Sequence, residues 1–409
     1  MTTLRFLNGL DTIGGNIVEI AQGDSRIIMD FGITDLDPQL TVPEMLAKHQ
    51  LPHLPELFLP NTPDHFHHEA IFISHLHIDH MGALKYLQSD IPIYLSPEAY
   101  KLYNVMIAEK MEVPVANLHI LPYETPLSVG NLTVTGFASD HDTVGAMALL
   151  VHDGQHYFAH SSDVRLNGPH AQRVLNWSRV LQEKRVKVFM LEGTTFSFDA
   201  PVPVEDTDHP AIPLTEETLA QRFTQLLTNP VTPSTQYVLN VYPRNVERML
   251  TLNQIALTNH HPILWEPQFA AIMHAFAPAA TIHTITEDNL NELKQVPGRF
   301  VLQNTFDHLD RLADLPHPTI YLHSNGEPLG DYDPRFAVLK EKIADWDIEL
   351  QFMSATGHAR KEDLIKLADL VHAQIIVPWH TFHPQAMADA LAPTYSDVLL
   401  PERDLYYEM

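Results

Sequence analysis

The chain has 409 residues, which at roughly 150 residues per domain predicts two to three domains. Its 45% of apolar residues can build their cores, which excludes disorder as the main state, and its net charge of −26 argues against a protein that coats nucleic acid by bulk electrostatics. The absence of cysteine excludes disulfides and thiolate metal sites, so any metal must be bound through nitrogen and oxygen.

Short runs of β-branched and apolar residues, separated by turn residues, predict strands throughout the first 190 or so residues. They fall at 16–20, 26–30, 71–74, 93–95, 132–138, 146–151, 156–159 and 186–191. A helix is predicted over 98–109, because Ser96 is a suitable N-cap and Pro97 suits the first helical position. The pattern is α/β, with strands outnumbering helices.

Residues 200–213 are rich in Pro, Asp and Glu, which predicts an exposed connection. A regular alternation follows, with strands at 237–241, 262–264, 300–302 and 319–322 and helices from Asn245, near Gln268 and from Pro334. This alternation is typical of a second, doubly wound domain of about 145 residues. The last sixty residues return to a helix at 361–372 and a strand at 375–377.

The start of the chain lacks the basic residues and apolar core of a signal peptide. No apolar run approaches the ~18 residues that are needed to span a bilayer. We therefore expect a soluble, cytoplasmic protein.

The segment IFISHLHIDHMGAL, residues 71–84, runs from a predicted strand directly into His75, His77, Asp79 and His80. Alternate residues of an extended backbone project to the same side, so His75, His77 and Asp79 can converge while His80 turns toward a second centre. A lone H-x-H pair is usually structural. The full six-residue pattern at a strand end instead predicts a dinuclear metal site, since histidine is the commonest metal ligand.

The same pattern is the signature of the metallo-β-lactamase superfamily, which this sequence resembles along its length. Four further residues fall in the order that the superfamily requires: Asp30 in IIMDFG, His141 in ASDHDTVG, Asp163 in FAHSSDVRLNG and His380 in IIVPWHT. The resemblance implies two divalent metal ions, Zn²⁺ or Mn²⁺. Their implied ligands are His75, His77 and His141 on one ion, Asp79, His80 and His380 on the other, and Asp163 bridging both. Asp30 is expected to orient a ligand rather than to bind metal.

Each outlying residue also has a structural explanation. His141 lies between Asp140 and Asp142, which suits a surface histidine in a salt-bridged loop. Asp163 suits a cap of the following turn, and His380, next to an aromatic residue, suits a buried histidine bonded to backbone. The joint occurrence of all the motifs in order favours the metal site.

The insertion before the last histidine resembles the β-CASP branch of the superfamily, which includes nucleases such as ribonuclease J. The motifs that carry this resemblance contain Glu192 in LEGTTF, His358 in SATGHARKEDL and His380 in VPWH. It implies a four-layer αββα metallo-β-lactamase domain at 1–198 and 346–409, with a doubly wound β-CASP-type α/β domain inserted at 199–345. The active site is expected in the cleft between them, with Glu192 supporting it rather than binding metal.

The inserted segment contains two further resemblances to this branch. NVYPRNVERM resembles a phosphate-contacting junction, where Arg244 and Arg248 lie one helical turn apart near a helix start that already favours anions. HSNGEP resembles a loop that holds a terminal phosphate through Ser324, Asn325 and Gly326. An ordinary exposed helix and an ordinary turn are the alternatives at these two places.

The function that the resemblance implies is two-metal hydrolysis of a phosphodiester in single-stranded RNA. A hydroxide shared by the metals and positioned by Asp163 would attack phosphorus, while His358 would bind substrate and assist the oxygen on which charge develops. Asp79 is counted with Asp163 and His358 as catalytic because it holds one of these metals. Two departures stand out. The triplet Ser161-Ser162-Asp163 replaces the usual T-G-D, which should change loop geometry. The sequence ends about thirty residues after His380, so we expect the protein to lack the further C-terminal domain of ribonuclease J.

The same residues are also compatible with two other functions. A metallo-hydrolase of a small ester, lactone or nucleotide phosphodiester would use the same metal site, and a non-catalytic RNA-end binding module would use only the phosphate contacts. The sequence also leaves open a homodimer, the choice between endo and exo cleavage, and the role of the cluster at His65–His68, which suits a solvated loop or a gate.

Overall fold

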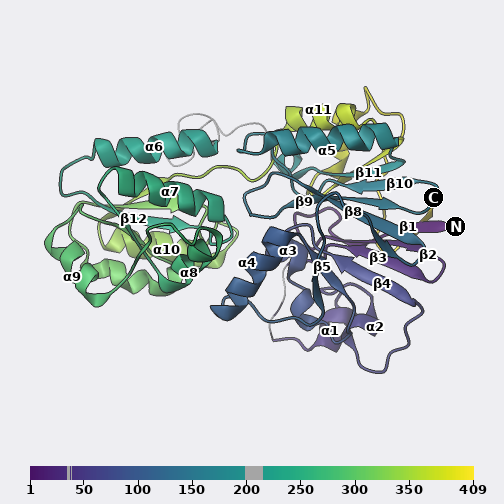
Figure 1. Ribbon diagram of the computed structural model, residues 1–409, viewed down its shortest axis with the longest axis horizontal. Helices are drawn as coiled ribbons and strands as arrows, with labels where there is room; N and C mark the ends of the chain where they lie inside the picture. The colour runs from purple at the N-terminus through teal and green to yellow at the C-terminus, as the bar shows by residue number, and fades with distance from the viewer. Residues whose placement is uncertain (35–36, 38, 199–214) are drawn as a thin grey trace. The chain divides into compact units, whose positions relative to one another are not determined.

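The computed structural model describes residues 1–34, 37, 39–198 and 215–409. The connection predicted at 200–213 lies outside the described residues. The chain divides into two compact units (Figure 1). The first unit comprises residues 1–107, 112–199 and 357–409, and the second unit comprises residues 108–111 and 200–356.

Two sheets form the centre of the first unit. One has the strand order β19-β1-β2-β3-β4-β5-β6. Its strands are β1 (Thr2–Asn8), β2 (Ile17–Gln22), β3 (Ser25–Met29), β4 (His68–Phe72), β5 (Ile93–Leu95), β6 (Leu118–Ile120) and β19 (Tyr406–Glu408). The other has the order β18-β11-β10-β9-β8-β7. Its strands are β7 (Leu127–Val129), β8 (Leu132–Ala138), β9 (Met147–His152), β10 (Tyr157–His160), β11 (Val188–Glu192) and β18 (Ile375–Trp379).

The two sheets pack face to face on one apolar core. Phe6 and Ile20 of the first sheet meet Leu149, Val188 and Val377 of the second, and all five side chains are almost completely buried. The alternation of apolar residues along each strand places these side chains on one face. Burial of this apolar surface is the main stabilising contribution to the sandwich.

Helices cover the outer faces of both sheets. The second sheet is covered by α5 (Ala171–Lys184), α11 (Lys361–Val371) and α12 (Pro384–Leu391), and Trp177 of α5 is wholly buried there. Figure 1 shows the other helices of this unit on the opposite side, beside the first sheet. They are α1 (Val42–Ala47), α2 (Pro55–Phe58), α3 (Ile78–Met81) and α4 (Pro97–Ala108), with a short 3₁₀ turn at Leu84–Tyr86. A second 3₁₀ turn, Thr194–Ser197, contacts α12 on the side of the second sheet. This four-layer αββα sandwich confirms the predicted fold class.

The second unit is built on a parallel sheet with the order β14-β13-β15-β12-β16-β17. Its strands are β12 (Gln236–Val241), β13 (Ile263–Trp265), β14 (His283–Thr284), β15 (Val301–Gln303), β16 (Thr319–Ser324) and β17 (Ile348–Phe352). Its helices are α6 (Glu216–Thr228), α7 (Val246–Thr258), α8 (Pro267–Phe276), α9 (Glu287–Gln295) and α10 (Pro334–Asp345), with a 3₁₀ segment at Phe306–Asp314. The expected doubly wound α/β architecture is present.

One boundary differs from the sequence expectation. The sequence placed the return to the first domain after residue 345, but β17 pairs in parallel with β16, from Thr319 opposite Ile348 to His323 opposite Phe352. The side chain of Ile348 is also buried in the core of the second unit. The compact units therefore divide between residues 356 and 357.

Within the described residues, no helix combines the length and the apolar character needed to cross a membrane.

A buried arginine holds several carboxylates at the outer edge of the first unit. The guanidinium of Arg26 on β3 contacts Glu69 on β4, Glu56 on α2 at 2.7 Å and Glu19 on β2 at 3.6 Å. Asp64 lies 3.8 Å away, and the ring of Phe66 stacks on the same guanidinium at 4.4 Å. Burial of the Glu69 carboxyl outweighs the attraction of Arg26 and raises the pKa of Glu69 to about 7.

We expect the Glu69→Gln variant to have a weaker pH dependence of stability than the wild type. A carboxyl whose pKa is higher in the folded state than in the unfolded state contributes stability below pH 4.5, and that contribution is lost as the pH rises through about 7. Thermal unfolding midpoints measured from pH 5 to pH 8 should therefore fall more for the wild type than for Glu69→Gln. The exposed Glu124→Gln variant serves as the control, and equal slopes for all three proteins would contradict the prediction.

Candidate metal centre

The four-ligand motif occupies the junction between a strand and a short helix. β4 ends at Phe72, His75 and His77 follow on extended backbone, and Asp79 and His80 lie in the first turn of α3. The backbone around α3 is held in place by hydrogen bonds from the N–H of Asn16 to the carbonyl of Asp79 and from the N–H of Phe31 to the carbonyl of His80. The motif is thus fixed by both neighbouring segments of the first sheet.

The structure brings all seven predicted ligands together in two overlapping groups. The three-histidine group consists of His75, His77, His141 and Asp163, and the Asp79 group consists of Asp79, His80, Asp163 and His380. Within each group the candidate ligand atoms lie within 4.8 Å of one another. Asp163 belongs to both groups, as the predicted bridging role requires.

The distances across the Asp79 group are short. Oδ2 of Asp163 lies 3.3 Å from Nε2 of His80, and Oδ2 of Asp79 lies 3.0 Å from Nε2 of His380. On the other side of Asp163, the same oxygen lies 3.6 Å from Nε2 of His75 and 3.7 Å from Nε2 of His141. One carboxylate therefore faces imidazoles of both groups.

In three of the candidate ligands, His80, His141 and His380, the ring nitrogen Nδ1 contacts a group outside the set of candidate ligands. Nδ1 of His80 lies 2.8 Å from Oδ2 of Asp30, and Nδ1 of His141 donates to the backbone carbonyl of Gly357. Nδ1 of His380 lies 2.7 Å from Oγ1 of Thr194. Such contacts set the tautomer and ring orientation that metal ligation needs. Asp30 thus lies where the sequence placed it, beside a ligand, whereas the sequence gave no signal for Thr194.

Ser162 occupies the position where the usual triplet has glycine. It has φ of 56°, in the left-handed region that favours glycine. Its hydroxyl lies 3.1 Å from Nδ1 of His75, so this serine contacts a candidate ligand. The change in loop geometry that the serine implies stays a prediction.

The electrostatics of the groups place most of these residues in the protonation states that metal ligation requires. Burial holds the pKa of His75 well below its ordinary value and lowers the pKa of His77 to about 4. Burial opposes ionisation of Asp163, but the surrounding imidazoles, led by His380 and His80, hold its pKa well below the usual range. His80 is the exception, because the carboxylates of Asp163, Asp79 and Asp30 outweigh burial and raise its pKa.

Two buried polar atoms indicate whether the candidate ligands are suited to bind metal ions. Within the described residues, Nε2 of His75 and Oδ1 of Asp163 are buried and form no hydrogen bond. Buried polar atoms are normally paired, so the unpaired atoms point to a missing cation. The donor set of neutral imidazoles and ionised carboxylates suits Zn²⁺ or Mn²⁺. The residues therefore fit divalent metal ions.

His358 and Glu192 form a pair beside the metal groups. Nδ1 of His358 lies 3.1 Å from Oε1 of Glu192, and Nε2 lies 3.9 Å from Oδ2 of Asp163. Burial lowers the pKa of His358, but the carboxylates of Glu192 and Asp163 outweigh this and raise it to about 9. Glu192 also accepts a hydrogen bond from the N–H of Thr194. Glu192 and His358 also form a third group of candidate ligand atoms with His380, so the supporting role of Glu192 stays a prediction.

The predicted phosphate contacts lie in the second unit, and one of them is corrected. Arg248 is buried, and its guanidinium is paired with Glu216 of α6 at 2.7 Å. It also donates to the backbone carbonyl of Ser324 and to Oδ1 of Asn325. A guanidinium held by these acceptors stabilises the unit instead of clamping a phosphate, so the expectation for Arg248 is wrong.

The remaining phosphate candidates lie at the carboxyl end of the parallel sheet. Arg244 follows β12, and Ser324, Asn325 and Gly326 follow or end the neighbouring β16. Asn325 has φ of 58° and accepts from the N–H of Ala355, which makes it a structural turn residue. In the described residues the hydroxyl of Ser324 is buried without a hydrogen bond. Arg244, Ser324 and Gly326 stay predictions.

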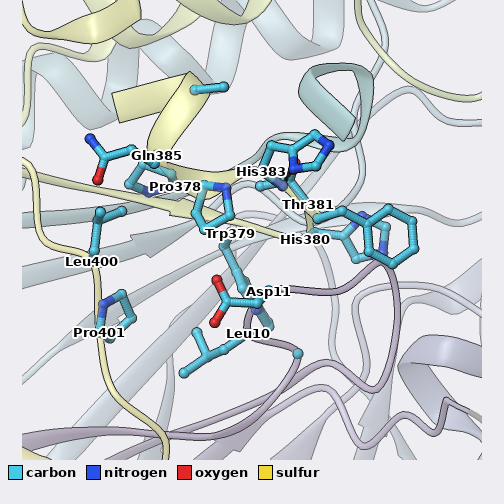
Figure 2. A pocket seen from close by; sticks show the side chains of 14 residues that line it. Leu10, Asp11, Pro378, Trp379, His380, Thr381, His383, Gln385, Leu400 and Pro401 are labelled. Carbon is cyan, nitrogen blue, oxygen red and sulfur yellow. Dashed lines mark hydrogen bonds between the residues drawn. The ribbon is translucent and has the colours of Figure 1, made fainter. Parts of the chain in front are cut away.

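A separate cavity of about 520 Å³ lies at the end of β18 in the first unit (Figure 2). It is lined by Leu10 and Asp11 after β1, by the segment from Pro378 to Ala386, and by Leu400 and Pro401. Of the seven candidate ligands only His380 lines it. Figure 2 shows the side chain of His380 at one edge of this cavity, and its Nε2 lies 3.0 Å from Asp79 of the metal groups.

Comparison with known proteins agrees with this site. The family described as "Beta-lactamase superfamily domain" matches residues 37–220. Ribonuclease J of Mycoplasma genitalium is 21% identical over 93% of this chain and 68% of its own length. Ribonuclease J 1 of Streptococcus pyogenes is 28% identical over 36% of this chain and 26% of its own length.

A solved structure is similar over almost the whole chain. The crystal structure of a protein of unknown function from Enterococcus faecalis V583 superposes with a TM-score of 0.84 at 28% identity. The match covers 99% of each chain, so both units have counterparts in that protein. The fold is therefore not peculiar to this sequence.

We expect Asp30→Asn to weaken metal binding without unfolding the protein. The substitution keeps the shape of the side chain but removes the charge that faces Nδ1 of His80, and losses of about 10–100-fold in metal affinity are typical of such changes. Isothermal titration of the metal-free protein with Zn²⁺ measures the effect, with the exposed Asp90→Asn as control. Unchanged affinity in Asp30→Asn would show that His80 needs no oriented partner.

Proposed function

This chain is a ribonuclease J-like protein of the metallo-β-lactamase superfamily, and from that premise we propose that it is a two-metal phosphodiesterase that hydrolyses single-stranded RNA. The coarser conclusion is that it is a hydrolase that depends on divalent metal. The observation that carries the finer proposal is the position of Asp163, which belongs to both ligand groups. A carboxylate shared in this way suits two cations that act on one phosphoryl group.

The residues of the site have distinct tasks in this proposal. The three-histidine group and the Asp79 group would hold the two cations, and Asp163 is the residue that both groups share. Bound there, the cations would lower the pKa of a water molecule and neutralise charge on the phosphoryl oxygens. Asp30, Thr194 and Gly357 keep the imidazoles oriented before substrate arrives.

His358 supplies the proton in this proposal. Its Nδ1 faces Glu192, so Nε2 is the nitrogen on the side of Asp163 and of the reacting phosphate. A histidine with a pKa of about 9 is protonated at neutral pH and donates to the oxygen on which negative charge develops. Glu192 orients this ring and stabilises its charged form.

A smaller substrate is the second candidate, and two observations favour it. Arg248 is used by the fold, which removes one of the cationic groups expected to contact RNA. The net charge of −26 also opposes a long polyanion away from the metal ions. In this alternative the same metal groups hydrolyse a small ester, lactone or nucleotide phosphodiester.

RNA cleavage tests the proposal directly. A 5′-monophosphorylated single-stranded RNA labelled at either end should be cut in the presence of Zn²⁺ or Mn²⁺, and His358→Ala should reduce the rate by about 10²–10⁴-fold, as expected for loss of a general acid. The label pattern separates endo from exo cleavage. Intact RNA alongside hydrolysis of a small phosphodiester or lactone would overturn the RNA proposal in favour of the second candidate.

Salt dependence gives an independent measurement of substrate size. Each phosphate contact makes binding weaker as the salt concentration rises, so RNA held at several phosphates shows a steep decrease in affinity. A small molecule shows almost none. The measurement should use catalytically inactive protein so that RNA is not consumed during titration.

Replacing Asp79 and His80 together should abolish turnover of either substrate class. The double substitution Asp79→Asn with His80→Ala removes two candidate ligands of one group, and leaves the three-histidine group intact. Metal analysis should then find about one equivalent fewer metal ion per chain, while circular dichroism shows an unchanged fold. Substantial retained activity in metal-depleted buffer would contradict the proposed role of the metal ions.

A further inference from the structure

The two acidic neighbours of His141 have different surroundings. The carboxylate of Asp140 is buried, where it pairs with Arg165 at 2.9 Å and accepts from the N–H of His170. Asp142 instead faces the metal groups. Its Oδ1 lies 3.3 Å from Nε2 of His77 and also 3.3 Å from Nε2 of His141. The salt-bridged loop that the sequence suggested around His141 therefore applies to Asp140 and not to Asp142.

The position of the hydrogen on the rings of His77 and His141 determines whether their contacts with Asp142 are attractive. The carbonyl of Gly357 can only accept, so Nδ1 of His141 carries the hydrogen, and in the neutral ring Nε2 has a lone pair. That lone pair faces the anionic Oδ1 of Asp142. Two acceptors at this distance repel each other unless a cation or a proton lies between them.

The contact between the two rings leads to the same conclusion. Nε2 of His141 lies 3.2 Å from Nδ1 of His77. If Nδ1 of His77 donates to His141, its Nε2 is an acceptor that faces Asp142. If Nε2 donates to Asp142 instead, two ring lone pairs face each other. Every neutral tautomer therefore leaves acceptors opposed. A cation bound by Nε2 of His77, Nε2 of His141 and Oδ1 of Asp142 would remove the repulsion at Asp142, with the hydrogen of the His77 ring on Nδ1.

The distances also match the edges of a coordination polyhedron. Ligand atoms at about 2.0–2.1 Å from one metal ion are separated by about 2.9–3.4 Å, depending on whether the ion has six or four ligands. The two contacts of Asp142 have this length. We propose that Asp142 is a further ligand of the metal ion held by His75, His77 and His141, an inference that rests on the proposed function only in requiring metal in that group.

Gly357 makes room for this carboxylate. A Cβ atom at position 357 would lie 2.7 Å from Cε1 of His141 and 2.8 Å from Cγ of Asp142. Both distances are shorter than real Cβ contacts allow, so a side chain at position 357 would displace the ring and the carboxylate together. The glycine therefore keeps His141 and Asp142 on one centre.

A carboxylate in this group changes which metal ion it prefers. Three imidazoles alone suit Zn²⁺, whereas added carboxylate oxygens favour harder ions such as Mn²⁺ and allow a higher coordination number. With Asp142 and Asp163 the three-histidine group offers three nitrogens and two oxygens. Asp142 is thus a determinant of metal selectivity in this chain.

Metal binding by Asp142→Asn tests the inference without using activity. Metal-free wild type and variant are titrated with Mn²⁺, with free Mn²⁺ followed by electron paramagnetic resonance. We expect one of the two sites to bind Mn²⁺ about 10–100-fold more weakly in the variant, and Zn²⁺ affinity to fall less. Asp90→Asn is the matched control, because its side chain is exposed and distant in sequence from the ligands.

The visible spectrum of the cobalt-loaded protein and a second variant give two further tests of whether Asp142 binds the metal ion. Removal of one ligand from the Co²⁺-loaded protein should intensify the visible bands, since lower coordination numbers absorb more strongly. Asp142→Ala should show the same Mn²⁺ defect, which covers the case in which Asp142→Asn does not fold. Wild-type Mn²⁺ affinity and an unchanged cobalt spectrum in Asp142→Asn would overturn the inference and leave Asp142 as an ion-pair partner.

The outcomes also separate this inference from the proposed function. Wild-type protein that binds two metal ions but leaves RNA intact contradicts the RNA proposal and does not affect Asp142. Wild-type protein that binds no metal contradicts both.

Discussion

A single buried carboxylate is the interaction on which the metal centre depends. Asp163 is 1% exposed, and its oxygens lie within 4 Å of five imidazoles, those of His75, His80, His141, His358 and His380. An isolated ionised carboxylate in such a position would cost several kcal/mol in lost hydration. The imidazoles and the cations that they bind offset that cost, so each of these rings must be held close to Asp163.

The sandwich meets this requirement through the alignment of its strand ends. β10, β11 and β18 are parallel neighbours whose register places Met190 opposite both His160 and Val377. Their carboxyl ends therefore reach the same edge of the sheet, where Asp163, Glu192 and His380 follow or end the three strands. The backbone hydrogen bonds between the strands fix these positions. The loops that follow the strands therefore determine only the final orientation of the side chains.

The sequence predicted those features that are carried by local pattern. The strands at 93–95 and 132–138 have the predicted bounds, because each is a short apolar run flanked by turn residues. The grouping of the seven candidate ligands, which the structure brings together, was implied by the resemblance to the metallo-β-lactamase superfamily. Features that depend on distant partners were missed: Arg248 is paired by Glu216, 32 residues earlier, and β17 joins the second unit because it pairs with β16. Asp142 was missed because nothing local distinguishes its surroundings from those of Asp140.

Charge balance connects the metal groups to the substrate. Asp79, Asp142 and Asp163 place three negative charges around the two groups, and two divalent cations would exceed them by one positive charge until the proposed hydroxide forms and adds a fourth negative charge. In the proposed mechanism a phosphodiester, which carries one negative charge, is therefore attracted to the centre before the hydroxide forms, whereas the rest of a chain with net charge −26 repels it. His358 adds a further positive charge beside Asp163, which favours the more negative transition state over the bound substrate. The attraction for phosphate is therefore concentrated where the bond is to be broken, and it depends on the carboxylates remaining fewer than the charges of the metal ions that they hold.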